Sequence, residues 1–150
     1  MNPENAIIIC PQCGTKNRIP MSRWGDRAFC GKCRTALPFF RYFPGQIVEV
    51  TDQTFKSEVL DFPGPVLLEF FAPWCGYCQR LAPLLDQIAS EYAGRVKFAK
   101  LNVDKNFHTA SQYAIKSTPT LFFFKEGRLV ARLLGAQPRG EIERHLTLIL

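Results

Sequence analysis

The 150-residue sequence lacks several features that define common classes of protein. Its longest apolar runs, 66–74 and 120–124, fall well short of the ~20 residues that span a membrane. The amino-terminal stretch has no basic start, and its apolar run is too short for a secretory signal peptide. Histidine occurs only twice, and we expect both His108 and His145 to be solvated surface residues rather than ligands. We therefore expect a cytoplasmic protein with no membrane association.

Cysteine, by contrast, occurs six times, in three Cys-x-x-Cys pairs. In a reducing compartment, paired cysteines more often bind metal or catalyse than form structural disulfides. The first two pairs have the spacing Cys-x2-Cys-x16-Cys-x2-Cys, which is typical of a zinc ribbon; they comprise Cys10, Cys13, Cys30 and Cys33. Four thiolates suit tetrahedral zinc, and a module of ~40 residues needs the folding energy that metal supplies. We predict one structural zinc ion, with two redox dithiols or two disulfides as the alternative.

The positive charge is concentrated at the amino-terminal end. Residues 1–41 carry seven basic and two acidic side chains, a balance of +5. The remainder carries twelve basic and eleven acidic side chains, a balance of +1. A basic zinc module raises nucleic acid as a partner, but a solvated surface is the simpler interpretation, and we do not expect nucleic-acid binding.

The third pair, Cys75 and Cys78, has no second pair with which to complete a tetrahedron. It stands between an apolar strand pattern and a helical pattern, where a helix amino terminus stabilises negative charge. Such a position lowers a thiol pKa. We predict that Cys75 is the exposed nucleophile and that Cys78, one turn deeper, resolves the mixed disulfide. Two buried structural thiols are the alternative.

The hydrophobic pattern divides the chain near residues 38–46. We predict a zinc-ribbon module over 1–40, an aromatic linker that packs on a neighbour, and an α/β domain over 41–150. The α/β domain has the predicted order βαβαβαββα, which implies a mixed central sheet flanked by helices. Its predicted elements are strands at 46–50, 65–71 and 95–103, helices at 51–60 and 75–92, a short helix at 106–114, a hairpin over 118–135 turned at "KEGR", and a final helix at 138–150.

Four segments of this α/β region, "FFAPWCGYC", "AKLNVDKN", "STPTLFFFKEGRLV" and "LLGA", resemble the thioredoxin family in order and spacing. Together with "CPQCGTKNRIP" and "CGKC", the chain resembles the zinc-containing bacterial branch of that family. The resemblance implies a thioredoxin fold preceded by a four-cysteine zinc ribbon. It also implies reduction of disulfide-containing substrate proteins, with recharging by an NADPH-dependent thioredoxin reductase. We expect a monomer.

The resemblance also implies roles at matching positions. Trp74 would pack beside the dithiol and contact partners, and Gly76 and Tyr77 would set turn geometry and redox poise. Pro119 matches the family's cis-proline, which faces the active site. Thr118 would offer backbone hydrogen bonds to an extended substrate segment.

Glu69 interrupts the apolar strand "VLLEFF", so we expect it to be buried and to titrate high. The family usually has aspartate at the matching position, and protein disulfide isomerase domains have glutamate. The resemblance implies that Glu69 relays a proton to or from the second cysteine. Lys100 matches the family lysine near this carboxyl, and we expect a Glu69–Lys100 pair to ease the burial.

Tyr77 departs from the family, which has proline there. Proline lacks a backbone N–H, whereas Tyr77 has one that can stabilise a thiolate. We therefore predict a couple more oxidising than that of a proline-containing thioredoxin. Two other functions remain open: a disulfide isomerase or oxidase, and a binding protein directed by the zinc module, with redox sensing through its thiolates.

Overall fold

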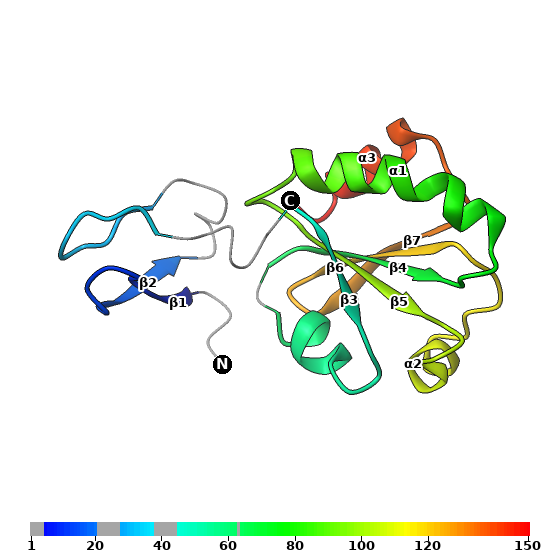
Figure 1. Ribbon diagram of the computed structural model, residues 1–150, viewed down its shortest axis with the longest axis horizontal. Helices are drawn as coiled ribbons and strands as arrows, with labels where there is room; N and C mark the ends of the chain where they lie inside the picture. Colours follow the sequence, from blue (N-terminus) through cyan, green and yellow to red (C-terminus); the bar gives the residue numbers. More distant parts are fainter. Residues whose placement is uncertain (1–4, 21–27, 38–44, 63) are drawn as a thin grey trace.

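The computed structural model of the protein describes residues 5–20, 28–37, 45–62 and 64–150. Figure 1 shows that the described residues form two sheets in two parts of the chain, one before and one after residues 38–44. Most of the predicted aromatic linker lies outside the described residues. Within them, no helix is both long enough and apolar enough to cross a bilayer.

The amino-terminal part is a small hairpin with a cluster of cysteines. Strand β1 (Asn5–Ile9) pairs antiparallel with β2 (Lys16–Pro20). Its buried core consists of Ile8, Leu37 and two cysteines, with Ile19 and Ala28 packed against them. So small an apolar cluster supplies little folding energy, as expected of a module that a metal stabilises.

The second part is built on a five-stranded mixed sheet. The spatial order is β3 (Ile47–Val50), β5 (Lys97–Asn102), β4 (Val66–Phe71), β6 (Thr120–Lys125) and β7 (Arg128–Leu134). The first three strands are parallel, and the last two are antiparallel to their neighbours. β4 is the middle strand, and its almost wholly buried side chains explain its near-continuous apolar sequence.

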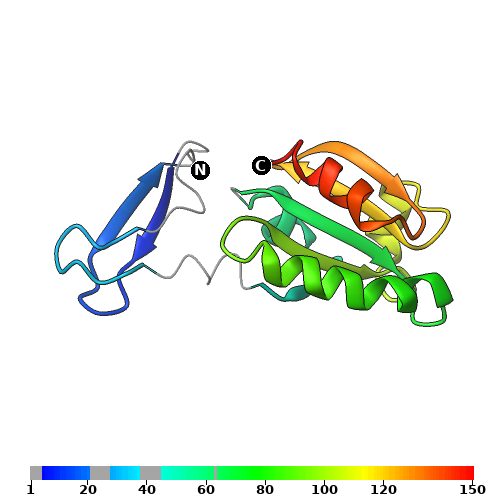
Figure 2. The same cartoon turned by 90° about the horizontal axis from the view of Figure 1, so that it is seen from above.

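Helices cover both faces of this sheet, as predicted. Figures 1 and 2 show α1 (Gly76–Glu91) and α3 (Arg139–Leu146) together on one face. The π-helix η3 (Lys56–Leu60) and the short α2 (Phe107–Gln112) lie on the other face. Two apolar clusters fill the two interfaces, and one of them includes Ile142, Leu146 and Ile149 of the carboxy-terminal segment, all of them buried.

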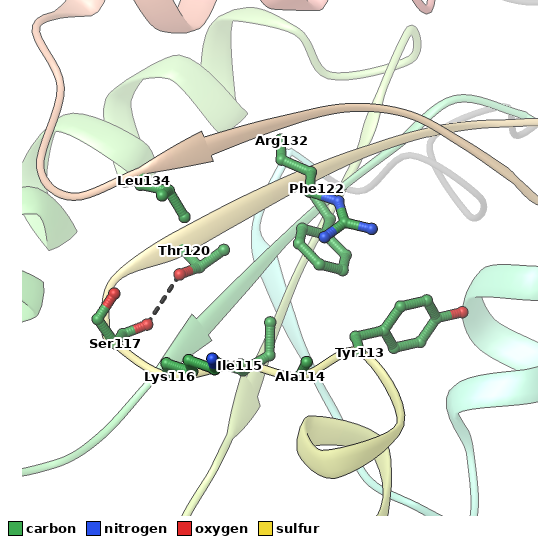
Figure 3. A pocket seen from close by; sticks show the side chains of 9 residues that line it. All are labelled: Tyr113, Ala114, Ile115, Lys116, Ser117, Thr120, Phe122, Arg132 and Leu134. Atoms are coloured by element: carbon green, nitrogen blue, oxygen red, sulfur yellow. Dashed lines mark hydrogen bonds between the residues drawn. The ribbon is translucent and has the colours of Figure 1, made fainter.

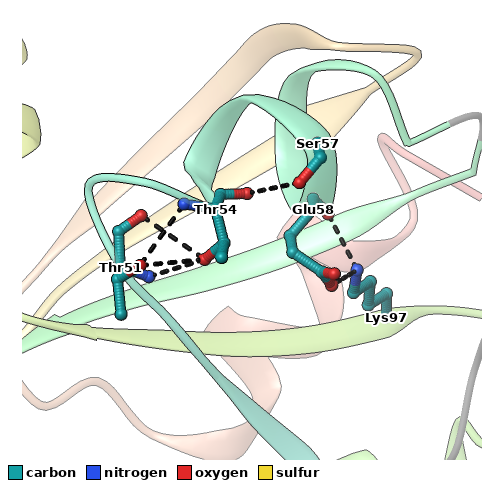
Figure 4. A network of polar contacts seen from close by, with 5 residues as sticks. All are labelled: Thr51, Thr54, Ser57, Glu58 and Lys97. Carbon is teal, nitrogen blue, oxygen red and sulfur yellow. Dashed lines mark hydrogen bonds and ion pairs between the residues drawn. The ribbon is translucent and has the colours of Figure 1, made fainter.

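The predicted helix over 51–60 is shorter than expected, because only residues 56–60 form η3. Thr51 and Thr54 exchange hydrogen bonds ahead of it: each backbone N–H donates to the other's hydroxyl oxygen, at 2.9 and 3.3 Å (Figure 4). Asp52, which also precedes η3, accepts instead from the N–H and hydroxyl of Thr109 at 2.9 and 2.6 Å. Its carboxylate thus stabilises the first turn of α2 rather than its own segment.

Lys97 is an unexpected buried cation on β5, with 6% of its surface exposed. Its ammonium group donates to the backbone carbonyl of Glu58 at 2.9 Å and pairs with the Glu58 carboxylate (Figure 4). The ammonium also lies 4.4 Å from the centre of the Phe62 ring. These contacts compensate the buried charge and fasten η3 to the sheet.

The β6–β7 hairpin turns at "KEGR", as predicted. Glu126 and Gly127 both have positive φ, 52° and 77°. A Cβ atom on Gly127 would lie 2.3 Å from the carbonyl oxygen of Leu60. Only glycine therefore meets both the backbone angle and the close approach of η3.

Candidate functional site

The third cysteine pair lies where β4 leads into α1. Cys75 is the N-cap of α1 and has an extended backbone, with φ −80° and ψ 112°. Its sulfur accepts a hydrogen bond from the backbone N–H of Cys78 at 3.1 Å, as a capping side chain does. On its other side, the same sulfur lies 3.5 Å from the carbonyl oxygen of Thr118.

Both cysteines of this pair are buried, which corrects the expectation that Cys75 is exposed. The residues Cys75 and Cys78 have 4% and 5% of their surface accessible. They pack in one small cluster with Ala72, Phe71 and Val103, and the Thr118 carbonyl approaches Cys75 from the loop before β6. Exposure therefore does not separate the two thiols.

Their ionisation does separate them. Burial opposes ionisation of Cys75, but hydrogen bonds with the side chains of Cys78 and Thr118 and with the backbone N–H groups of Cys78 and Tyr77 outweigh it and lower the Cys75 pKa. Burial is the largest cause that raises the pKa of Cys78, to about 11, and the neighbouring Cys75 adds to it. The pair thus holds one thiol that ionises readily and one that keeps its proton.

Glu69 lies in the middle of β4 and is buried, as predicted, with 5% of its surface exposed. Its Oε2 atom has no hydrogen-bond partner among the described residues. Burial raises the pKa of Glu69 to about 7; the positive charge of Lys100 opposes this shift, and the carboxylate of Asp86 on α1 adds to it. The carboxyl group can therefore gain or lose a proton near neutral pH.

Lys100 is the direct neighbour of Glu69 across the parallel pairing of β4 and β5. Its ammonium nitrogen lies 5.2 Å from the centre of the Phe71 ring, over which it is placed. Lys100 thus acts on Glu69 through its charge, while its ammonium group contacts an aromatic ring that borders the cysteine pair.

Two aromatic side chains stand at the surface beside the dithiol. Trp74 is 74% exposed, and its Nε1–H donates to the Asp104 carboxylate at 2.9 Å. The backbone N–H of Asp104 donates in turn to the Asn102 side chain at 2.9 Å. Sequence reasoning missed Asp104, although it lies within the quoted "AKLNVDKN". Its bond holds a large exposed ring in one orientation.

The other aromatic is Tyr77, which is 63% exposed. The guanidinium of Arg80 lies 5.3 Å from the centre of its ring. Gly76, between Cys75 and Tyr77, is also exposed. The Thr118–Pro119 peptide bond is cis, as expected from the resemblance. The structure therefore gathers most of the predicted site residues at one end of β4.

The two histidines lie outside this site. His108 is exposed, and its backbone N–H donates to Asp52 at 3.2 Å. His145 is only partly exposed, which corrects the expectation of a solvated side chain. Its Nδ1 lies 2.7 Å from the carbonyl oxygen of Glu141, and its ring centre lies 5.3 Å from that of Phe123. The ring is a packing element of α3.

The other four cysteines converge, as predicted, on one point in the amino-terminal part. The sulfurs of Cys10, Cys13, Cys30 and Cys33 all lie within 4.8 Å of one another. The Cys10–Cys33 and Cys13–Cys30 separations are both 3.6 Å. A tetrahedral zinc with sulfurs at about 2.3 Å requires sulfur–sulfur distances of about 3.8 Å, so the cluster fits a metal of that size.

The two halves of the cluster repeat one backbone design. In each half, the N–H two residues after the first cysteine points to its sulfur at 3.4 Å, from Gln12 and from Lys32. The residue after the second cysteine then adopts positive φ, 77° at Gly14 and 66° at Arg34. The sequence signal for this repeat is Cys-x-x-Cys-x-Thr, because Thr15 and Thr35 each place a hydroxyl 3.1 Å from the second sulfur. We missed that signal in the sequence.

Asn17 on β2 joins the two halves of the metal cluster. Its side-chain oxygen accepts from the N–H of Gly31 at 3.0 Å, and its side-chain nitrogen donates to the carbonyl of Thr15 at 3.1 Å. Asn17 is 9% exposed. An outer contact of this kind holds the two halves together and orients the cysteine ligands around the metal.

A helix-capping thiol, a second thiol whose pKa is raised and a buried carboxyl together define a thiol–disulfide redox protein. The cluster of four thiols shows that the protein also belongs to the metal-binding class. Comparison with known proteins agrees. Residues 46–147 match the family model described as thioredoxin, and residues 9–35 match that of the thioredoxin 2 amino-terminal zinc ribbon. The chain belongs to the thioredoxin family.

Named relatives support the same assignment. The chain is 50% identical to thioredoxin 1 of Nostoc sp. over 102 residues, which cover 65% of this chain and 95% of that protein. It is 52% identical to thioredoxin of Synechocystis sp. over 91 residues, which cover 61% and 85%. It is 48% identical to thioredoxin 1 of Synechococcus elongatus over 101 residues, which cover 65% and 94%. The chain is therefore a thioredoxin-type redox protein, consistent with a protein-disulfide reductase.

Proposed function

We propose that this protein reduces disulfides of other proteins in the cytoplasm, with Cys75 as the nucleophile and Cys78 as the resolving cysteine. One observation carries the assignment of the two roles. The Cys75 sulfur accepts the Cys78 N–H at the start of α1 and has a lowered pKa, whereas burial raises the pKa of Cys78 to about 11. The thiolate that attacks is thus Cys75.

The reaction takes two steps. The Cys75 thiolate attacks one sulfur of the substrate disulfide, forms a mixed disulfide and releases the other substrate sulfur as a thiolate. Cys78 then loses its proton and attacks Cys75, which forms the Cys75–Cys78 disulfide and releases the second substrate thiolate. The substrate gains two electrons and the dithiol loses two. A thioredoxin reductase with NADPH as its electron source would restore the dithiol.

Glu69 is the proposed proton acceptor for the second step. Cys78 holds its proton firmly, so a base near neutrality speeds its attack. The Glu69 pKa of about 7 suits that purpose. The positive charge of Lys100 lowers the Glu69 pKa and so helps to set the protonation equilibrium of that carboxyl group. The described contacts include no direct Glu69–Cys78 hydrogen bond, so the transfer would pass through a water molecule.

The substrate-binding residues proposed are those around the dithiol: Trp74, Gly76, Tyr77, Thr118 and Pro119. The two exposed aromatics offer apolar contact area next to a buried sulfur. The hydrogen bond that Trp74 donates to Asp104 keeps the ring oriented, so little entropy is lost when a partner binds.

The amino-terminal module, residues 1–40 in our division, would hold one structural zinc ion, and residues 41–150 would form the redox domain. Zinc is the metal proposed because it favours four thiolates in a tetrahedron and the sulfur separations fit. All four positions would be filled by cysteine, so the ion would hold the fold and bind no substrate. We propose a monomer that does not bind nucleic acid.

The test is reduction of insulin disulfides coupled to NADPH and thioredoxin reductase. Cys75→Ser should lower the rate more than about 10³-fold, because it removes the nucleophile. Cys78→Ser should instead trap a mixed disulfide with substrate, visible by mass spectrometry. Full activity in Cys75→Ser would refute the proposal.

A second candidate function, isomerase- or oxidase-like exchange, is favoured by one observation. The backbone N–H of Tyr77 helps to lower the pKa of Cys75, which stabilises the reduced form. Equilibration with glutathione would separate the two candidates, since a strong reductant stays oxidised under conditions that leave an oxidase reduced.

A further inference from the structure

A cavity of about 370 Å³ opens beside the loop between α2 and β6 (Figure 3). One wall is the segment Tyr113 to Ser117, which connects α2 to β6. The other walls come from β6 and β7, where Phe122 and Leu134 supply apolar surface. None of the proposed redox steps uses this cavity.

The charged side chains of the cavity are all of one sign. Lys116 and Arg132 both line it, and the described lining contains no carboxylate. The Arg132 guanidinium lies 5.2 Å from the centre of the Phe122 ring, its cross-strand neighbour, and Figure 3 shows it above that ring. The cavity therefore combines an apolar floor with two cations, and it fits a ligand that has both an apolar body and a negative charge.

The position of the cavity ties it to the dithiol. Ser117 lines the cavity, and the next residue, Thr118, places its carbonyl 3.5 Å from the Cys75 sulfur. The Thr120 hydroxyl donates to the Ser117 carbonyl at 2.8 Å, which holds this bend in one shape. A polypeptide whose disulfide lies at Cys75 can thus reach the cavity by passing Thr118.

We propose that this cavity is a specificity site for the substrate polypeptide: it takes an acidic side chain, with an apolar neighbour, from a position near the attacked disulfide. Ser117, which lines the cavity, directly precedes Thr118, so the acidic residue should lie only a few residues from the attacked cysteine. The class of substrate is then a protein whose disulfide is flanked by aspartate or glutamate. The inference rests on the proposed function, because it assigns the selection of substrates for that reaction.

Charge complementarity identifies an acidic segment of the substrate as the ligand of the cavity. Two cations at the surface repel a basic segment and attract an acidic one, an effect that acts on encounter as well as on the bound state. Leu134, 63% exposed at the end of the edge strand β7, offers apolar contact to the residue beside the acid.

The experiment uses the full-length, metal-loaded, reduced protein and a set of short peptides, each with one intramolecular disulfide. The peptides differ only in a single Glu, Gln or Lys, moved along positions on both sides of the attacked cysteine. The reduction rate under single-turnover conditions gives kcat/KM for each peptide. We expect the Glu peptide to react roughly three- to tenfold faster than the Lys peptide at one or two adjacent positions, and equally fast elsewhere.

The decisive variants replace both basic residues of the cavity, Lys116 and Arg132. Lys116→Gln with Arg132→Gln should abolish the Glu-over-Lys preference, and Lys116→Glu with Arg132→Glu should reverse it. Arg128→Gln is the matched control, because Arg128 is an exposed arginine on the same strand that does not line the cavity. Circular dichroism and the thermal midpoint check that each variant folds, and the rate with the Gln peptide checks that the dithiol reacts normally.

Each other outcome overturns the inference. Equal rates for Glu and Lys peptides at every position would show that the cavity selects nothing. A preference that survives the double Gln variant would place the selection elsewhere on the surface. The proposed function fails separately, and only if Cys75→Ser still reduces the Gln peptide.

Discussion

The same four-residue pattern, Cys-x-x-Cys, builds two different devices in this chain. All three pairs close with the same bond, from the N–H four residues after the first cysteine to its carbonyl. That donor is Gly14, Arg34 or Gln79, at 3.0, 3.0 and 3.1 Å. The difference lies in what the chain does at that donor residue.

In the metal cluster, the chain turns back at that residue. Gly14 and Arg34 have positive φ, which ends the turn and returns the chain, as the bonds Cys10 N–H to Thr15 and Cys30 N–H to Thr35 show. In the redox pair, Gln79 lies within the sixteen-residue helix α1, and the chain continues as a helix beyond it. The first design exposes two sulfurs to a second pair. The second design makes the first sulfur the cap of a helix, where it accepts the Cys78 N–H and meets no second cysteine pair.

The largest expected effect comes from removal of one metal ligand, which should affect the metal cluster and leave the redox pair active. Cys30→Ser should release the metal and unfold the described amino-terminal residues, because metal binding supplies most of their folding energy. Reduction of insulin should stay within about twofold, since the ribbon core and the dithiol belong to separate apolar clusters. Metal content by atomic emission and amide exchange in the ribbon would check both. A loss of activity in step with the metal would mean that the two devices are coupled.

Glu69→Gln tests how the buried carboxyl group makes the free energy of unfolding depend on pH. Its pKa is raised from 4.5 to about 7, so its contribution to stability is complete below about pH 4.5 and is lost as the pH rises through 7. Between those limits, the free energy of unfolding of the wild type should fall by about 3 kcal/mol, whereas that of the variant should not. Urea unfolding at pH 4 and pH 8 measures this difference.

The control for this variant is Glu49→Gln, which alters an exposed carboxyl on β3. It should leave the pH profile of stability unchanged. Glu69→Gln should also slow release of substrate from the mixed disulfide. A wild-type profile of unfolding identical to that of Glu69→Gln would contradict a raised pKa, and unchanged release would rule out the relay.

Tyr77→Pro tests how much the backbone N–H of Tyr77 contributes to the reduction potential of the redox pair. It removes one N–H that favours the Cys75 thiolate, so the couple should become more reducing. One hydrogen bond of about 0.5–1.5 kcal/mol corresponds to about 10–30 mV for two electrons. Tyr77→Phe keeps the N–H and should leave the potential unchanged. A potential that shifts equally in both variants would assign the effect to the ring.

The smallest expected effect lies at the two turning residues of the metal cluster. Arg34→Gly should stabilise the metal-bound ribbon by up to about 1 kcal/mol, because glycine adopts positive φ without strain. Gly14→Ala should destabilise it by a similar amount, and the cost is conformational, since nothing lies within 4 Å of a Cβ there. Competition with a chromogenic chelator measures both. Effects of the same sign would contradict the shared backbone design.

The sequence alone determined much of this protein. The apolar periods of β4 and α1, and the hairpin turn at Gly127, are local signals, so the order of elements, the mixed sheet and the buried position of Glu69 followed from them. The spacing of the four ligand cysteines is also local, because two residues between cysteines allow one tight turn to aim two sulfurs at one ion.

Only the tertiary structure decided which contacts those elements make. It showed that Cys75 is as buried as Cys78, that Asp52 caps α2 and not its own segment, and that Asp104 orients Trp74. Such partners lie far apart along the chain, 57 positions for the bond that Asp52 accepts, and they meet through the packing of separate elements. A sequence pattern records what each residue can do with its near neighbours, whereas burial and the pKa of a buried thiol or carboxyl depend on everything packed around it.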